Sequence, residues 1–216
     1  MVMRIKWRLF MQAWIYKNTI KKIQLKLLVF LVCLVPLLRL IALAYSDQLS
    51  ANPIEFITRS TGTWALVFLC ITLSVTPIRQ ITSYNKIIKL RRMFGLFCFF
   101  YAFLHFCIWI WIDNGFEWHE IIADFYKRTF ITLGLIAFTL LIPLALSSSK
   151  KSQKWLGRKW ALLHRLTYII AILVLLHFWI HKAGKNDFST VNIYIAIVSV
   201  LFIWRIYKKL SHSFKR

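Results

Sequence analysis

The chain has 216 residues, of which 59% are hydrophobic and 17% aromatic, a composition that excludes an ordinary soluble domain and indicates a polytopic membrane protein. Its formal net charge of +22, from 29 Lys and Arg against 7 Asp and Glu, would suit a nucleic-acid-binding protein unless membrane topology accounts for the basic residues. All four cysteines lie inside apolar runs without a CxxC pair, so we interpret them as buried apolar side chains rather than disulfides.

A helix that crosses a bilayer needs about 20 mostly apolar residues. In chain order, six runs meet this requirement, near 27–45, 64–78, 93–112, 129–146, 160–180 and 190–207. Pro36 should kink the first of these helices, and Gly62 is interpreted as a breaker before the second. The length of the first run and its basic leader favour an uncleaved helix over a signal peptide.

These runs predict an all-α, six-helix transmembrane bundle. The predicted organisation is a basic cytoplasmic or interfacial leader at 1–26, a transmembrane domain at 27–207 and a basic cytoplasmic tail at 208–216. The leader mixes Trp and Phe with Lys and Arg, as expected of a segment lying on anionic lipid headgroups. A solvated basic tail is the alternative.

The basic residues are sorted between alternate connections. Segments 1–26, 79–92, 147–159 and 205–216 carry 7, 5, 5 and 5 Lys or Arg and no acid. The other three connections hold all seven acids and only five basic residues. This is the positive-inside pattern, which predicts that both termini lie in the cytoplasm and that nucleic acid is not a partner.

The six histidines fall into two groups. Three are expected at interfacial or solvated positions: His119, His181 and His212. The other three, His105, His164 and His177, lie inside spans, where an ionisable side chain is costly and is a functional candidate by default. The alternative is that each only hydrogen-bonds a neighbouring helix.

The three histidines within the spans do not all lie at the same depth in the membrane. With a rise of about 1.5 Å per residue, His177 lies about 20 Å from His164, and His105 lies about 20 Å from the cytoplasmic end of its span. His105 and His177 therefore share a depth near the external face. Two neutral imidazoles facing each other across a bundle are what b-type haem iron needs as axial ligands. These spans offer no carboxylate at that depth to complete a structural zinc site and no acid for a proton relay.

The cytoplasmic end offers a second candidate site, made of His164, Arg91 and Arg92. Arg91 precedes His105 by fourteen positions, which returns it to nearly the same helix face. The two arginines are either membrane anchors or contacts to haem propionates, a flavin phosphate or a quinone carbonyl. On an ideal helix the side chains of His164 and His177 would point in directions about 140° apart. This difference fits either helix bending or two different kinds of site.

Five stretches carry a resemblance to a known family: "STGTWAL", "SVTPIR", "KLRRMFGLFCFFYAFLH", "KRTFITLG" and "LGRKWALLHRLTYIIAILVLLHFW". In this order they resemble the haem-binding membrane subunit of the bacterial periplasmic methionine sulfoxide reductase system, over about residues 26–210. More distantly, the chain is similar to the ferric-reductase-like transmembrane domain of NADPH oxidases and ferric reductases.

The resemblance implies a multi-pass protein of the bacterial inner membrane that passes electrons from the quinone pool to a periplasmic molybdopterin subunit. That partner would reduce methionine sulfoxide in oxidised envelope proteins, so terminal catalysis is expected there. The implied cofactors are haem b, with FMN as a family cofactor, and the implied haem-associated residues are His105, His164 and His177. The wider superfamily has four such histidines, whereas this chain has Arg91 at the fourth position.

Two other functions are compatible with the residues. One is a stand-alone transmembrane cytochrome b that reduces a metal or ascorbate. The other is a haem-free transporter or scaffold whose histidines only bond neighbouring helices. A complete NADPH-driven reductase is excluded for this single chain, because no soluble nucleotide-binding module or GxGxxG motif is present.

Overall fold

The computed structural model describes residues 2–184 and 186–213, and this part of the chain is helical and contains no strand. Six of its helical segments are long and apolar enough to cross a membrane: Ile23–Tyr45, Pro53–Thr82, Arg91–Ile112, Thr129–Leu146, Arg158–Ala183 and Ser189–Ser211. The prediction of an all-α protein with six spans is therefore confirmed.

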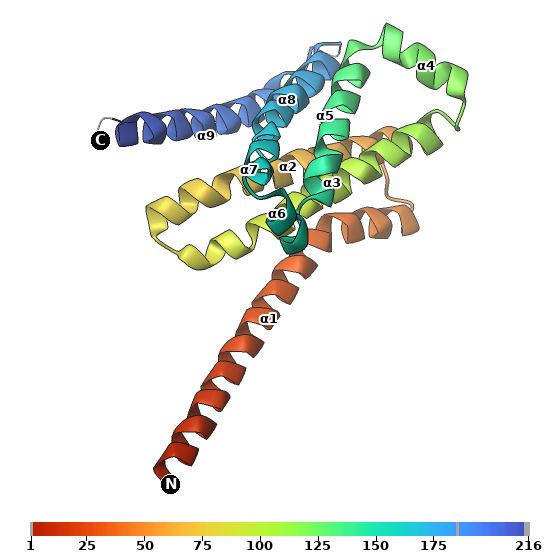
Figure 1. Cartoon of the computed structure of the whole chain (residues 1–216). Helices are drawn as coiled ribbons and strands as arrows, with labels where there is room; N and C mark the ends of the chain where they lie inside the picture. The colour runs from red at the N-terminus through yellow and green to blue at the C-terminus, as the bar shows by residue number, and fades with distance from the viewer. Residues whose placement is uncertain (1, 185, 214–216) are drawn as a thin grey trace. The chain divides into compact units, whose positions relative to one another are not determined.

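The chain divides into two units, of which the first ends at Gln48. This unit is the helix α1 (Val2–Tyr45), which runs without interruption through the boundary expected at residue 26. The helix changes direction in its second half, the part that contains Pro36 (Figure 1), as expected for a proline that removes a backbone hydrogen bond. The side chains of residues 1–22 lie outside the described part, so the headgroup contacts of the leader stay a prediction.

The second unit begins at Leu49 and holds the other five spans. Its helices, in chain order, are α2 (Pro53–Thr82), the 3₁₀ helix η1 (Asn85–Lys89), α3 (Arg91–Ile108) with the π-helical turn η2 (Trp109–Asp113), α4 (Trp118–Lys127), α5 (Thr129–Leu146), α6 (Lys150–Leu156), α7 (Arg158–Leu163), α8 (Leu166–Ala183) and α9 (Ser189–Ser213).

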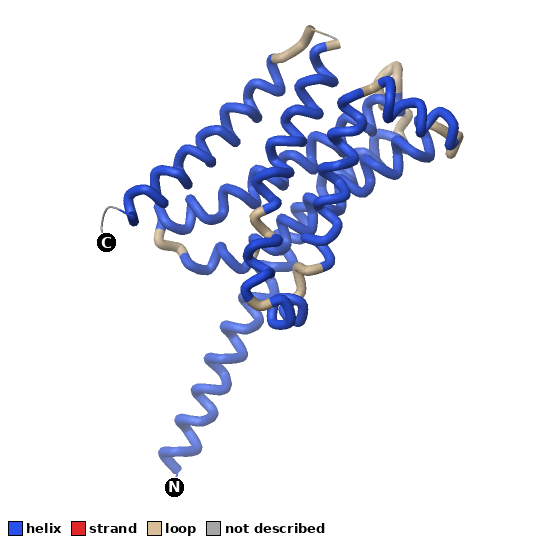
Figure 2. Tube along the Cα trace, turned by 45° about the horizontal axis from the view of Figure 1, so that its top comes forward, coloured by secondary structure: helices blue, strands red, loops and turns tan. Residues whose placement is uncertain are grey.

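Two helical hairpins form the body of this unit. α2 packs mainly on α3 and α5 mainly on α8, while α3 also contacts α5, and α9 contacts both α2 and α8. Figure 2 shows these spans running lengthwise beside one another. Two of the candidate histidines lie one in each hairpin: His105 on α3 and His177 on α8.

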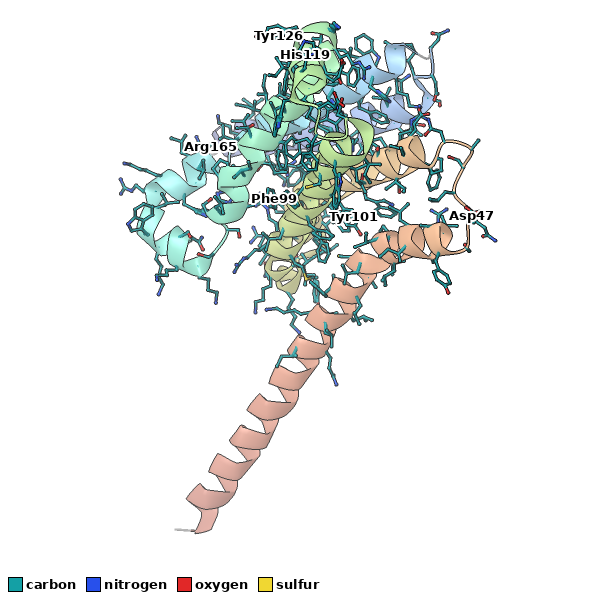
Figure 3. The ribbon with its side chains drawn as sticks, turned by 90° about the vertical axis from the view of Figure 1, so that its right-hand side faces the viewer. Asp47, Phe99, Tyr101, His119, Tyr126 and Arg165 are labelled. Atoms are coloured by element: carbon teal, nitrogen blue, oxygen red, sulfur yellow. The ribbon has the colours of Figure 1, made fainter. Side chains whose placement is uncertain are left out.

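Aromatic side chains fill the space between the spans. Phe68 of α2 stacks on Phe97 and Tyr101 of α3, with ring centroids 5.6 and 5.4 Å apart, and Tyr101 is completely buried. Phe99 and Tyr101 lie on different faces of α3 (Figure 3), because two positions turn a helix by about 200°. Phe99 instead stacks on Phe138 of α5 at 5.9 Å. Aromatic rings of α3 therefore contact both its hairpin partner α2 and the other hairpin.

The second span begins earlier than the apolar run predicted. α2 starts at Pro53, with Asn52 as its N-cap, whose side-chain oxygen accepts the backbone N–H of Glu55 at 3.2 Å. Proline at the first helical position and an Asn cap are strong helix-start signals. Gly62 consequently lies inside α2 rather than before it, which corrects its interpretation as a helix breaker.

The fifth predicted span is divided in the structure. α7 ends at Leu163, His164 and Arg165 form a turn, and α8 begins at Leu166. The hydroxyl of Thr167 donates to the carbonyl oxygen of His164 at 2.8 Å, which satisfies a carbonyl that the interrupted helix leaves open. The 140° rotation expected between His164 and His177 assumed one ideal helix, which this turn interrupts.

A charged contact closes the connection from α8 to α9. Lys182 Nζ donates to Asp187 Oδ2 at 2.5 Å, and Ser189 Oγ donates to Asp187 Oδ1 at 2.8 Å. The hydrogen bond from Lys182, followed by that from Ser189, lowers the pKa of the Asp187 carboxyl from its ordinary value. A carboxylate whose pKa falls on folding stabilises the folded state above its unfolded pKa of about 3.9 and loses that effect as the pH falls.

An Asp187→Asn variant is therefore expected to melt only on the order of 2 °C below the unmodified protein at neutral pH, because nearly half of the Asp187 side chain is exposed to solvent. The difference should shrink as the pH falls below about 4, where the unfolded chain binds the proton, and close once the pH passes the lowered pKa of folded Asp187. Thermal unfolding in detergent at several pH values measures this. The Lys182→Met variant should have a similarly lowered melting temperature. The double variant Lys182→Met and Asp187→Asn should melt no lower than either single variant; additive decreases would contradict the pairing of the two side chains.

Candidate functional site

His105 of α3 and His177 of α8 face each other in the interior of the second unit. Their ring centroids lie 6.2 Å apart and their planes are nearly perpendicular, at 83°. The structure thus brings together the two imidazoles that were expected at one depth. Their helices belong to different hairpins, so the pair bridges the two halves of the bundle.

Each imidazole is fixed by a backbone carbonyl of the partner helix in its own hairpin. His105 Nδ1 lies 2.9 Å from the carbonyl oxygen of Thr58 on α2, and His177 Nδ1 lies 2.6 Å from that of Phe130 on α5. A carbonyl can only accept, so each Nδ1 is the protonated nitrogen and each Nε2 carries the lone pair. Metal-binding histidines commonly have this arrangement, because it sets the tautomer and the orientation of the ring.

A glycine makes room for each ring. A Cβ at Gly62 would lie 3.1 Å from His105 Nδ1, and one at Gly134 would lie 2.8 Å from His177 Nδ1. Both glycines follow the acceptor residue by four positions, and both acceptors precede their histidine by 47 positions. No internal repeat is evident in the sequence, yet the two hairpins present the same carbonyl, glycine and histidine arrangement.

The donor set fits a haem better than a metal held by protein alone. No group of three or more His, Cys, Asp or Glu in the described residues could hold a metal ion. Two axial bonds of roughly 2 Å, extended by the distance from each nitrogen to its ring centre, place two imidazole centroids on the order of 6 Å apart. The observed 6.2 Å agrees with that value.

Two polar atoms near the pair have no acceptor among the described residues. They are Trp109 Nε1, one turn after His105, and Arg59 Nε, next to Thr58. The Arg59 guanidinium also pairs through Nη2 with Glu55 Oε1 at 2.8 Å. Buried donors without acceptors are rare in folded proteins and suit a ligand that carries acceptor oxygens.

The other predicted site residues lie apart from this pair. His164 Nδ1 lies 3.1 Å from the carbonyl oxygen of Trp160, whose side chain stacks on the His164 ring at 4.0 Å. Arg91 Nη1 donates to Thr76 Oγ1 at 3.5 Å, and its charge is close enough to His164 to interact with it. Arg92 is exposed. Arg91 is therefore within electrostatic range of His164, whereas the Arg92 side chain is exposed.

The remaining histidines differ in their surroundings. The His119 side chain on α4 is 94% exposed, as expected for a solvated residue (Figure 3). His181 is partly buried within the fifth span, with its ring 5.1 Å from that of Phe130, so its expected position beyond the span is corrected. The His212 side chain lies outside the described residues.

Several residues around these sites were missed from the sequence. Near the pair they are the carbonyls of Thr58 and Phe130 with Gly62 and Gly134. At the other site they are Thr76, which accepts the hydrogen bond of Arg91, and Tyr168, over whose ring Arg205 lies. One signal was present: Gly62 precedes His105, and Gly134 precedes His177, by the same 43 positions.

The fold and site define a multi-pass helical membrane protein of the ferric-reductase-like class. Residues 61–175 match the family model described as ferric reductase like transmembrane component, a stretch that contains both glycines, His105 and His164. No solved structure matches the chain.

Curated relatives specify the family more closely. A protein of Ralstonia nicotianae is 50% identical over 187 residues, covering 83% of this chain and 86% of the relative. One of Herminiimonas arsenicoxydans is 50% identical over 85% of this chain and 84% of the relative, and one of Bordetella pertussis is 45% identical over 85% and 89%. All three are named protein-methionine-sulfoxide reductase heme-binding subunit MsrQ. The chain belongs to the MsrQ family.

Proposed function

We propose that this chain is the membrane electron-transfer subunit of a methionine sulfoxide reductase system and that His105 and His177 are the axial ligands of a b-type haem. The observation that carries the proposal is the facing imidazole pair at 6.2 Å, with both Nδ1 atoms held by backbone carbonyls. The relatives named as heme-binding subunits support the cofactor.

The residues around the pair have distinct tasks in this proposal. The carbonyls of Thr58 and Phe130 hold the two rings and leave Nε2 of each as the ligand nitrogen. Gly62 and Gly134 keep the space beside the rings open. Trp109 Nε1 and Arg59 Nε are donors available to ligand oxygens. A bound haem supplies one-electron chemistry, since its iron alternates between the ferric and ferrous states.

The charge distribution supports an orientation for this electron path. If both termini lie in the cytoplasm, as the positive-inside rule predicts, His164 and Arg91 lie at the cytoplasmic end of an inner membrane protein and the His105–His177 pair lies toward the periplasm. Quinol or reduced FMN would deliver electrons at the cytoplasmic site of His164, Arg91 and Arg92. A periplasmic molybdopterin subunit would receive them and reduce methionine sulfoxide.

The decisive experiment is an optical redox titration of the purified protein, with haem and flavin quantified on the same sample. The expected result is a reduced spectrum of b type and reoxidation when a purified methionine sulfoxide reductase partner and oxidised substrate are added. A colourless preparation would contradict the haem site. A b-type spectrum with reduction of metal or ascorbate, but no transfer to the partner, would instead favour a stand-alone cytochrome b.

A further inference from the structure

The short helix α4 exposes a row of large apolar side chains. The helix follows η2, at the end of α3 that carries His105. Trp118, Ile122 and Tyr126 are spaced by four positions, which keeps them within about 80° of one another around the helix. All three side chains are exposed, and Tyr126 is the most exposed of them, at 88%. An apolar face therefore runs along α4 (Figure 3).

The other side chains of α4 form two further faces. One face packs on the bundle: Ile121 and Asp124 are buried, and the ring of Phe125 lies 6.0 Å from that of Trp109. The hydroxyl of Thr132 on α5 also donates to the carbonyl oxygen of Phe125 at 2.8 Å. The remaining face is polar and exposed, and it holds His119, Glu120 and Lys127. The buried face thus fixes α4 on the bundle and leaves the apolar and polar faces exposed.

The apolar face of α4 continues onto the third span. Trp111 and Ile112 are exposed at the end of this span. The ring of Phe116, in the connection to α4, lies 6.3 Å from that of Trp111. Lipid covers the side chains that a membrane-spanning helix leaves exposed within the bilayer. We call the following residues the apolar stripe: Trp111, Phe116, Trp118, Ile122 and Tyr126.

The backbone at Phe116 has an uncommon conformation. Its φ is 63°, directly after Gly115 with a φ of 55°, and bulky residues rarely adopt this left-handed conformation. The Phe116 N–H donates to the carbonyl oxygen of Ile110 at 3.1 Å, which holds the turn in place. Strained residues persist where the surrounding structure fixes them, and they are frequent in functional segments. The strained turn places an exposed aromatic ring between Trp111 and α4.

We propose that α4 lies in the membrane interface, with the apolar stripe inserted between lipid headgroups and the first part of the acyl chains. Trp and Tyr are enriched in this zone because their rings are amphipathic. A helix with separate apolar and polar faces lies flat in it. With ten residues, α4 has about half the length that a membrane span needs. The inference is independent of the haem site.

The continuity of the stripe favours lipid over a protein partner as its occupant. The stripe begins with Trp111 on a span, so a bilayer that surrounds this span also reaches Phe116 and the start of α4. The polar face lies on the other side of α4, since Glu120 and Lys127 are turned by about 140–160° from Ile122. A helix seated in the interface would keep these charges in water while its apolar stripe contacts lipid.

Nitroxide labels on α4 test this proposal in nanodiscs of phosphatidylcholine. The labelled variants are Trp118→Cys and Ile122→Cys on the stripe, with Glu120→Cys and Lys127→Cys as matched controls on the same helix. The unmodified chain, treated with the same label, reports any reaction of the native cysteines. Power saturation in electron paramagnetic resonance compares collisions with oxygen, which concentrates in lipid, and with a nickel chelate, which stays in water.

The labels at positions 118 and 122 should lie about 5–10 Å into the boundary between headgroups and acyl chains. They should therefore collide often with oxygen and seldom with the nickel chelate, whereas the labels at positions 120 and 127 should be accessible to the chelate. Equal nickel accessibility at all four positions would overturn the proposal. Low accessibility to both reagents on the stripe would also overturn it, because that result indicates burial against protein.

The unmodified protein offers a second measurement that needs no substitution. Hydroxyl-radical footprinting in the same nanodiscs should protect Trp118 and Tyr126 and oxidise His119 on the same helix. Adding the purified methionine sulfoxide reductase partner should leave this pattern unchanged. If Trp118 and Tyr126 are oxidised until the partner is added, the stripe is a protein interface and the lipid proposal is wrong. A colourless preparation would reject the haem site and leave both measurements valid.

Discussion

A His177→Ala or His105→Ala variant of the purified protein is expected to lose most of the b-type Soret and α bands of the reduced spectrum. Each substitution removes one of two facing imidazoles, and the nearest other histidine, His181, packs on Phe130 instead. A haem held by one axial bond is easily lost during purification in detergent. The molar ratio of haem to protein, measured after size-exclusion chromatography, gives the extent of haem loss in each variant.

Two further variants make this result specific. His119→Ala is the matched control, because its side chain is exposed on α4, and it should retain the full spectrum. His164→Ala should keep the bands of the His105–His177 site, since its own contacts are with Trp160. Retention of both bands in His105→Ala and in His177→Ala would contradict the assignment of these histidines as haem ligands.

A Gly134→Ala variant is expected to reduce haem content nearly as much as loss of His177 itself. The added Cβ would lie 2.8 Å from His177 Nδ1, closer than real contacts allow, so the ring must move away from the Phe130 carbonyl. The helix itself should not suffer, because Ala favours a helix over Gly by about 0.8–1 kcal/mol. The variant should therefore fold normally and still lose its colour.

Glycine variants elsewhere provide the comparison. Gly62→Ala should have a smaller effect, because its Cβ would lie 3.1 Å from the His105 ring and a shift of a few tenths of an ångström relieves the contact. Gly95→Ala, on α3, is the control, since its Cβ would meet only Thr72 Cγ2 at 3.8 Å. Equal haem content in Gly134→Ala and Gly95→Ala would show that the glycine does not shape the site.

Residue counting along the spans was sufficient to predict that His105 and His177 share a depth, because helical rise depends only on position in the chain. The carbonyl partners could not be predicted in this way. Contact of His105 with Thr58 depends on how α2 and α3 are rotated about their axes, which side-chain packing decides. The role of Gly62 beside the His105 ring was missed for the same reason, because it is visible only once the neighbouring helix is in place.

The end of the bundle that holds Arg205 and His164 shows the same limit. Arg205 was counted as one of the basic residues of the C-terminal segment, where the positive-inside rule accounts for it. Its contacts with Leu73 and Tyr168 join α9 to α2 and α8, and such long-range contacts are not visible in a charge pattern. The turn at His164 was hidden likewise, because the apolar run continues through it without Pro or Gly.

The acceptors that hold the two imidazoles belong to the main chain, which has a consequence for tolerance to mutation. Every amino acid offers the same carbonyl oxygen, so the hydrogen bond does not depend on which side chain stands at positions 58 and 130. This protein already has a small polar residue at one, Thr58, and a large aromatic one at the other, Phe130. Substitutions there should leave the orientation of the rings unchanged, whereas a side chain is restricted at position 62 and more strongly excluded at position 134.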